Sequence, residues 1–258
     1  MLCAAAACGE VSTSALDTAP AQRLQLPNAL REVSGLAALD RNRLLTVTDE
    51  LANVYSINIE TGAVDVLFSL GDPVIAADFE GITIAGNDVW LVTSRGVLYR
   101  AINGLSGGLD IPFEVFSTGL EDRCEVEGLA FDSTQFLLVC KENFRQRDRN
   151  KLMIQVWTPG DRRARVYLAR KLNLPGSSRE LSPSGLAIDG NTLHIVAARQ
   201  SLLLTIDREG NLLSASHLQG HPQAEGIAVM RNGSIVIADE GKKTGGFISR
   251  HVPVGDGD

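Results

Sequence analysis

The sequence predicts an all-β, five-bladed β-propeller with four-stranded antiparallel blades, closed by an N-terminal strand. Five copies of one motif each contain a glycine, and these glycines are 46, 47, 57 and 41 residues apart. A period of about 40–50 residues built from short strands is typical of propeller blades. The five copies are Glu32-Val33-Ser34-Gly35, Asp78-Phe79-Glu80-Gly81, Glu125-Val126-Glu127-Gly128, Ser182-Pro183-Ser184-Gly185 and Gln223-Ala224-Glu225-Gly226.

Each period also reads as four short strands separated by turn residues. In the second period the apolar stretches are residues 81–84, 89–93, 97–100 and 113–116. In the fourth period they are residues 185–188, 193–197, 202–206 and 212–217. Tight Gly- and Asn-containing turns between such stretches are typical of hairpins, and no stretch longer than ten residues has helical periodicity.

The two ends of the sequence indicate how the ring closes. The fifth period ends after three strands, near residues 246–253, while residues 22–27 form one orphan strand before the first motif. We expect the orphan strand to complete the last blade, because closure removes the edges that an open sheet would expose. Residues 21–258 then form one propeller domain, and an open β-sandwich is the alternative.

The N-terminus resembles the end of a bacterial lipoprotein signal, and on this interpretation we expect the true start of the signal upstream of Met1. Residues 1–10 combine a short apolar run with small residues and two cysteines, Cys3 and Cys8. We expect a lipid on Cys8 and a tether up to residue 20, so that residues 1–20 are leader and tether. A plain unstructured N-terminus is the alternative. The leader predicts a periplasmic or outer-membrane lipoprotein that touches the membrane only through its anchor.

The overall charge bears on partners. The chain carries a formal net charge of −7 and has no apolar run near the roughly 18 residues of a membrane-spanning helix. A negative protein is repelled by nucleic acids and anionic lipid surfaces, so nucleic-acid partners are not expected. We expect a monomer with a small-molecule or protein ligand.

One face of the predicted disc gathers most of the charge. The start of an innermost strand and the end of the next strand lie at the same end of a hairpin, so both positions belong to one rim. Eleven acids against three bases on this rim account for the whole net charge. The set is Glu32, Asp49, Glu50, Asp78, Glu80, Glu125, Glu127, Glu142, Glu225, Asp239 and Glu240, with Arg95, Lys141 and Arg199.

Such a concentration of carboxylates needs positive charge among them. Oxygen ligands suit a hard cation, and Ca²⁺ is the cofactor we expect. Glu80, Glu127 and Glu225 each precede a motif glycine, so they are the predicted metal ligands at the channel mouth. In the alternative, the three basic side chains bridge neighbouring blades.

Two classes of function remain open. The channel mouth is either the site of a ligand- or partner-binding module, or the active site of a metal-dependent hydrolase of a phosphoester or lactone. In the second case Glu240 or Asp49 would act as the base. No nucleophile or histidine base is predicted at the rim, which favours binding, and no catalytic residue is assigned.

Two other sequence features, a histidine pair and a cysteine pair, add little to the functional prediction. His217 and His221 have a helical metal spacing, but their segment is turn-like and continues into Pro222. Cys124 and Cys140 fall in one blade near the rim, and we expect buried free thiols in preference to a disulfide.

The motif residues resemble the SdiA-regulated domain family of bacterial envelope proteins. The likeness rests on residues 124–130 with Lys141-Glu142-Asn143, on residues 184–187, and on residues 223–228 with Asp239-Glu240. It implies a propeller behind an N-terminal signal or membrane segment, with a Ca²⁺ site in the channel. A remoter likeness, through Asp78-Phe79-Glu80-Gly81, is to calcium-dependent lactonase and phytase-like esterase propellers.

Overall fold

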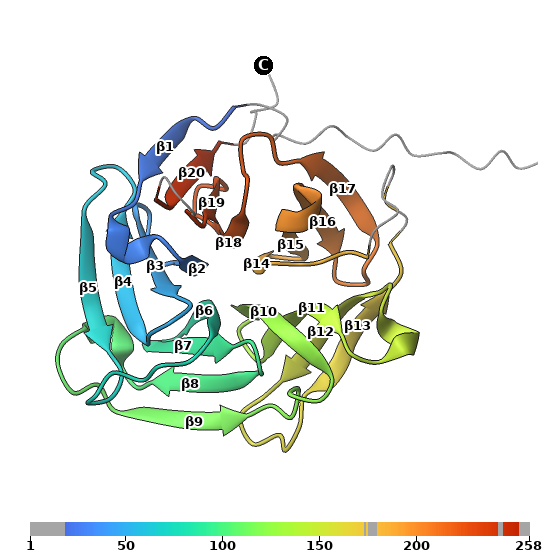
Figure 1. The fold of residues 1–258 in the computed structure, drawn as a ribbon, viewed down its shortest axis with the longest axis horizontal. Helices are drawn as coiled ribbons and strands as arrows, with labels where there is room; N and C mark the ends of the chain where they lie inside the picture. Colours follow the sequence, from blue (N-terminus) through green and yellow to red (C-terminus); the bar gives the residue numbers. More distant parts are fainter. Residues whose placement is uncertain (1–18, 173, 175–179, 242–244, 253–258) are drawn as a thin grey trace, which may run out of the picture.

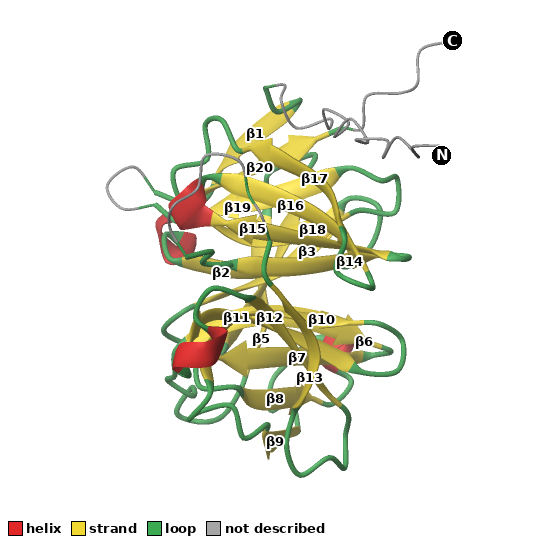
Figure 2. Ribbon diagram, turned by 90° about the vertical axis from the view of Figure 1, so that its right-hand side faces the viewer, coloured by secondary structure: helices red, strands yellow, loops and turns green. Residues whose placement is uncertain are grey.

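The computed structural model describes residues 19–172, 174, 180–241 and 245–252. Five four-stranded antiparallel sheets are arranged around a central axis, and Figure 1 shows one strand of each sheet at the centre of the ring. In the side view of Figure 2 the strands run between two faces where the loops collect. The predicted five-bladed propeller is confirmed.

The blades follow the chain in order, each with its innermost strand first. Blade 1 contains β2 (Val33–Ala38), β3 (Arg43–Thr48), β4 (Asn53–Asn58) and β5 (Val64–Ser69). Blade 2 contains β6 (Phe79–Ala85), β7 (Asp88–Thr93), β8 (Val97–Ala101) and β9 (Phe113–Ser117). Blade 3 contains β10 (Cys124–Phe131), β11 (Phe136–Asn143), β12 (Leu152–Trp157) and β13 (Arg165–Arg170). Blade 4 contains β14 (Gly185–Asp189), β15 (Thr192–Ala197), β16 (Leu202–Asp207) and β17 (Leu212–His217).

Blade 5 is built from both ends of the described chain. Its strands are β18 (Ala224–Val229), β19 (Ile235–Asp239), β20 (Phe247–His251) and β1 (Gln22–Gln25). Strand β1 pairs antiparallel with β20, with Gln22 opposite Arg250 and Gln25 opposite Phe247. The predicted closure by the N-terminal strand is therefore confirmed, and Figure 1 shows β1 at the outside of this blade.

Helical structure in the described residues is limited to four 3-10 turns. These are η1 (Asn28–Leu30), η2 (Gly104–Ser106), η3 (Gln146–Asp148) and η4 (Ala198–Gln200). None of the helices in this described part of the chain is long and apolar enough to cross a membrane.

The hydrophobic core lies within and between the blades. Between blades 2 and 3, for example, Trp90 packs against Phe136 with ring centroids 4.4 Å apart, and Trp157 completes the cluster. All three side chains are buried. Alternate strand residues point to opposite faces of a sheet, so each blade offers one apolar face to each neighbour.

The motif glycines are required by close approach of the innermost strands. A Cβ on Gly35 would lie 2.8 Å from the Cα of Gly81, and a Cβ on Gly81 would lie 2.9 Å from the backbone N of Leu129. Any larger residue would push neighbouring blades apart. Gly35 also has a φ of +73°, which other residues rarely adopt. The glycine recurs in every motif because the innermost strands pack too closely around the axis for a larger residue.

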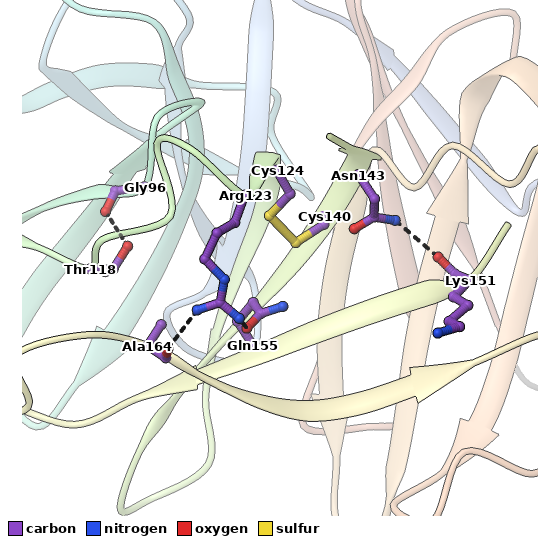
Figure 3. Close-up of a disulfide and its surroundings, with 9 residues drawn as sticks. All are labelled: Gly96, Thr118, Arg123, Cys124, Cys140, Asn143, Lys151, Gln155 and Ala164. Atoms are coloured by element: carbon purple, nitrogen blue, oxygen red, sulfur yellow. Dashed lines mark hydrogen bonds between the residues drawn. A yellow bond between two sulfur atoms is a disulfide. The ribbon is translucent and has the colours of Figure 1, made fainter. Parts of the chain in front are cut away.

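Blade 3 contains a disulfide between Cys124 on β10 and Cys140 on β11, so the expectation of free thiols is wrong. The Cα atoms are 5.7 Å apart, inside the usual range for a disulfide. Antiparallel pairing of β10 with β11 creates this proximity although the cysteines are 16 residues apart. Figure 3 shows the disulfide beside Arg123, whose guanidinium donates hydrogen bonds to the Ala164 carbonyl and the Gln155 side chain.

Candidate channel-mouth site

The three predicted metal ligands share one structural position, the extra residue of a β-bulge. Strand pairing skips from Phe79 to Gly81 in blade 2, and Glu80 is the residue left unpaired. Glu127 and Glu225 are skipped in the same way in blades 3 and 5. A bulge bends its strand and re-aims the side chain of the extra residue. Three equivalent bulges therefore direct three carboxylates to one end of the channel.

These glutamates line one cavity at the channel mouth, with a volume of about 130 Å³. Its acidic and basic lining residues come from three of the five blades and from the segments beside them. They are Glu32, Asp49, Glu80, Glu127, Lys141, Glu225 and Glu240. Six carboxyl groups and one ammonium thus surround the space, which we call the acidic cavity. The structure brings together half of the fourteen rim residues that the sequence singled out.

Burial and mutual repulsion raise the pKa values of the three glutamates that precede the motif glycines. For Glu80, burial followed by the charges of Glu127 and Asp78 raises the pKa to about 9. Burial is also the largest cause for Glu127, whose pKa rises to about 8, and for Glu225, whose pKa rises to about 7. Because each charged carboxylate is costly here, a cation that enters the cavity is favoured.

Lys141 is the positive charge that the fold itself places in this cavity. Its Nζ lies 2.6 Å from Oε1 of Glu127 and 3.8 Å from Oε1 of Glu125. Burial lowers the pKa of Lys141, but the charges of these glutamates outweigh burial and raise it overall. The acidic cavity therefore already accommodates one ammonium group.

Neutral side chains donate hydrogen bonds to some of the other carboxylate oxygens in the cavity. Ser34 donates a hydrogen bond of 3.1 Å to Oε2 of Glu80, and Gln223 donates one to Oε2 of Glu240. Oδ1 of Asp49 is buried and has no hydrogen-bond partner among the described residues. Burial and four neighbouring acids raise the pKa of Asp49 to about 6. The cavity thus keeps unsatisfied acceptor capacity.

The other predicted rim residues lie outside the acidic cavity. Most of them stand at the surface of the same face or at its edge, and these are Glu50, Asp78, Arg95, Glu125 and Glu142. Arg199 lines a second cavity next to the first. No ion pair within the described residues joins Arg95 or Arg199 to a rim carboxylate, so the predicted bridges between blades are not formed by these two arginines.

Asp239 is buried beneath the rim and does not line the cavity. Its Oδ2 lies 2.5 Å from Nδ1 of His221, and its Oδ1 accepts the backbone N–H of Gln223. His221 in turn places its Nε2 3.0 Å from Nε2 of His251. This buried chain was missed by the sequence reasoning, which weighed His221 only with His217 as a metal-spacing pair. In the fifth motif Gln223 stands three residues before the glycine, where the first three motifs have an acid. This departure from the pattern was the one sequence signal that could have pointed to the buried chain.

The carboxylates suit Ca²⁺ chemically but do not form a preassembled cage. All donors are hard oxygen atoms, as Ca²⁺ prefers. Among the described residues, however, no group of three or more His, Cys, Asp or Glu side chains is close enough to hold an ion. The ammonium of Lys141 already donates a hydrogen bond to Oε1 of Glu127. An ion bound by Glu80, Glu127 and Glu225 would therefore require Lys141 to withdraw.

The opposite end of the channel has a different character. A cavity of about 200 Å³ there is lined by residues from all five innermost strands, mostly aliphatic ones such as Leu36, Ile82 and Leu129. Among the described residues, acidic side chains line only the cavity at the motif end. This asymmetry places the candidate site on one face of the disc.

Fold and site together define a five-bladed β-propeller with an acidic channel mouth. The sequence pattern of the family described as SdiA-regulated matches residues 160–248, which cover β13, all of blade 4, and β18 and β19 of blade 5. The expected resemblance to this family is thereby confirmed. No curated protein matches the sequence.

Solved structures share the fold at low sequence identity. Glutaminyl cyclase from Myxococcus xanthus is 15% identical with a TM-score of 0.60, over 90% of this chain and 94% of that one. Aldose sugar dehydrogenase from Streptomyces coelicolor, in its PQQ-bound form, is 15% identical with a TM-score of 0.53, over 90% and 99%. A chain of a nidogen/laminin complex is 15% identical with a TM-score of 0.50, over 80% and 72%. At this identity the likeness concerns the fold alone.

Proposed function

We propose that this protein is a ligand-binding module whose acidic cavity takes a cationic group, with Ca²⁺ as the first candidate. The observation that carries the proposal is the convergence of Glu80, Glu127 and Glu225, each from a bulge, on one cavity with a single internal ammonium. Six carboxyl groups against one lysine leave an acidic surplus in a partly buried space. A second cation relieves that repulsion without any change of fold.

Calcium is tested by comparing melting in EDTA with melting in millimolar CaCl₂. Binding to the folded state alone stabilises by about 2.7 kcal/mol at a hundredfold excess over Kd. For a domain of this size that corresponds to a rise in Tm of roughly 5–10 °C. The triple variant Glu80→Gln, Glu127→Gln, Glu225→Gln should lose the rise.

The matched control is Glu50→Gln with Glu142→Gln, because both side chains belong to the same rim but are exposed. This double variant should keep the full response. A response that survives in the triple variant, or disappears in the control, would place cation binding elsewhere. No response of the unmutated protein to Ca²⁺ or to an organic ammonium would overturn the proposal.

Hydrolysis is the second candidate. Asp49 and Glu240, the two bases considered for it, both line the acidic cavity, and the pKa of Asp49 is raised to about 6. A carboxylate with a pKa near neutrality is suited to general-base work. The test is a panel of model esters, lactones and phosphoesters with and without Ca²⁺. Turnover that vanishes in Asp49→Asn or Glu240→Gln would replace the binding role by catalysis.

We also propose that the protein works in the bacterial cell envelope. The disulfide between Cys124 and Cys140 supports this, because such bonds persist in oxidising compartments and are rare in the cytosol. The proposed lipid attachment at Cys8 lies outside the described residues. Mass spectrometry of the native protein tests it, and an unmodified Cys8 in a chain that retains Met1 would refute it.

A further inference from the structure

Blade 4 interrupts the acidic ring. Its motif has Ser182 and Ser184 at the two positions where blades 2 and 3 both carry acids, and its second strand ends without an acid before Arg199. Strand β14 also pairs with β15 from Gly185 onward without a register shift, so no bulge aims a side chain into the mouth from this blade. The channel mouth is therefore acidic on one side and open on the other.

A second cavity of about 340 Å³ lies at this interruption, and we call it the blade-4 notch. Ser182, Ser184, Ala198, Arg199 and Pro222 line it. It shares Lys141, Gln223 and Glu225 with the acidic cavity, so the two spaces adjoin.

Hydrogen bonds hold Ser184 in the wall of the notch, and Arg199 can interact with a ligand there. Ser184 is buried, donates to the Ala224 carbonyl at 2.6 Å and accepts the Ala198 N–H at 3.1 Å. Arg199 is exposed and forms no ion pair with any residue that the structure describes. Its guanidinium is thus free to form charge-assisted hydrogen bonds with an anion.

We propose that the channel mouth binds a small zwitterion, with its amine in the acidic cavity and its carboxylate or phosphate against Arg199 in the notch. The inference rests on the proposed cation binding and names the class of ligand. The pair of Lys141 and Glu127 shows that an ammonium group fits among these carboxylates. A metal ion alone would leave the notch unused, whereas a simple anion would be repelled by Glu225 at the shared boundary.

The test uses ω-amino acids from 4-aminobutanoate to 8-aminooctanoate, each compared with the alkylamine and the alkanoate of the same chain length. Calorimetry should show at least one ω-amino acid binding about tenfold more tightly than its alkylamine, the gain expected for one charge-assisted contact. The alkanoates should not bind. Arg199→Gln should reduce the advantage to less than twofold while leaving alkylamine binding unchanged.

Arg95→Gln is the matched control, because Arg95 is exposed at the equivalent strand end of blade 2 and lines neither cavity. It should keep the advantage. If alkylamines bind but no ω-amino acid in the series exceeds them, or if Arg199→Gln changes nothing, the zwitterion inference is wrong and cation binding stands. If neither amines nor Ca²⁺ bind, both proposals fail.

Discussion

Nδ1 of His221 lies 2.5 Å from Oδ2 of Asp239, and both side chains are completely buried. The Nδ1–H of His221 donates a hydrogen bond to this carboxylate, and Nε2 of His221 lies 3.0 Å from Nε2 of His251. Asp239 also holds the backbone N–H of Gln223, a residue that lines both cavities. A buried polar chain therefore connects β20, the strand that pairs with the closing strand β1, with the channel mouth.

Removing the carboxylate from this chain should destabilise the protein. Asp239→Asn replaces the charged acceptor of the buried His221 ring, and a hydrogen bond to a charged group contributes about 1.5–3 kcal/mol. Urea unfolding at pH 7 measures the loss. Glu142→Gln, an exposed rim carboxylate, is the control and should change stability by less than about 0.5 kcal/mol. Equal stabilities would mean that the chain contributes nothing to the fold.

His251 should make the protein sensitive to acid. Burial, then the charges of His221 and Arg23, lower its pKa to about 4 from an ordinary 6.5. The unfolded chain therefore binds more protons than the folded chain between these values, and stability falls as pH drops from 6.5 to 4. His251→Gln should flatten this part of the pH profile, whereas His217→Gln, at an exposed position, should not. Parallel profiles for His251→Gln and the unmutated protein would contradict the assignment.

Glu80 should act in the opposite direction. Its pKa is raised in the folded protein to about 9 from 4.5, so the folded chain binds more protons in between and stability falls as pH rises through this range. Glu80→Gln removes the cost of this proton uptake and should raise Tm by roughly 3–6 °C at pH 8. The gain should vanish near pH 4, where the carboxyl group is protonated in both states. A gain of the same size at both pH values would point to packing instead.

Lys141 should compete with added cations. Lys141→Met removes the ammonium beside Glu127, so the acidic cavity loses its internal cation and the variant should melt below the unmutated protein in EDTA. Its response to CaCl₂ or to an alkylamine should be larger, because no internal group must withdraw. The control is Lys151→Met, whose lysine pairs with Asp148 outside the cavity. A weaker response in Lys141→Met would indicate that the lysine assists binding.

The disulfide should add to stability without defining the fold. A loop of this size, closed by cysteines 16 residues apart, is worth about 3 kcal/mol through the unfolded state. The double variant Cys124→Ser, Cys140→Ser should lose about that amount in urea unfolding. Dithiothreitol should destabilise the unmutated protein by a similar amount and leave the double variant unaffected. If dithiothreitol leaves the stability of the unmutated protein unchanged, the disulfide does not contribute to it.

The five blades and the closing strand could be predicted because short, local sequence patterns indicate each of them. Each motif glycine marks a place where neighbouring strands meet, and the orphan strand at residues 22–27 has the same apolar alternation as a blade strand. Because the same motif and strand pattern recur, the strand arrangement inferred for one blade applies to the other four. The convergence of Glu80, Glu127 and Glu225 followed from the same repetition, since equivalent positions in a closed ring share one face.

Within that frame, the tertiary structure decided which charges meet. Asp239 and Glu240 are adjacent in sequence, yet Asp239, the last residue of β19, is buried against His221, whereas Glu240, just after the strand, lines the acidic cavity. The partner of Asp239 comes from another segment, 18 residues away, and no local pattern encodes that contact. The sequence by itself determined the ring and the face that carries the carboxylates. Only packing of distant segments decided the place of Lys141 among them, the disulfide and the open notch at blade 4, because these depend on distances between strands.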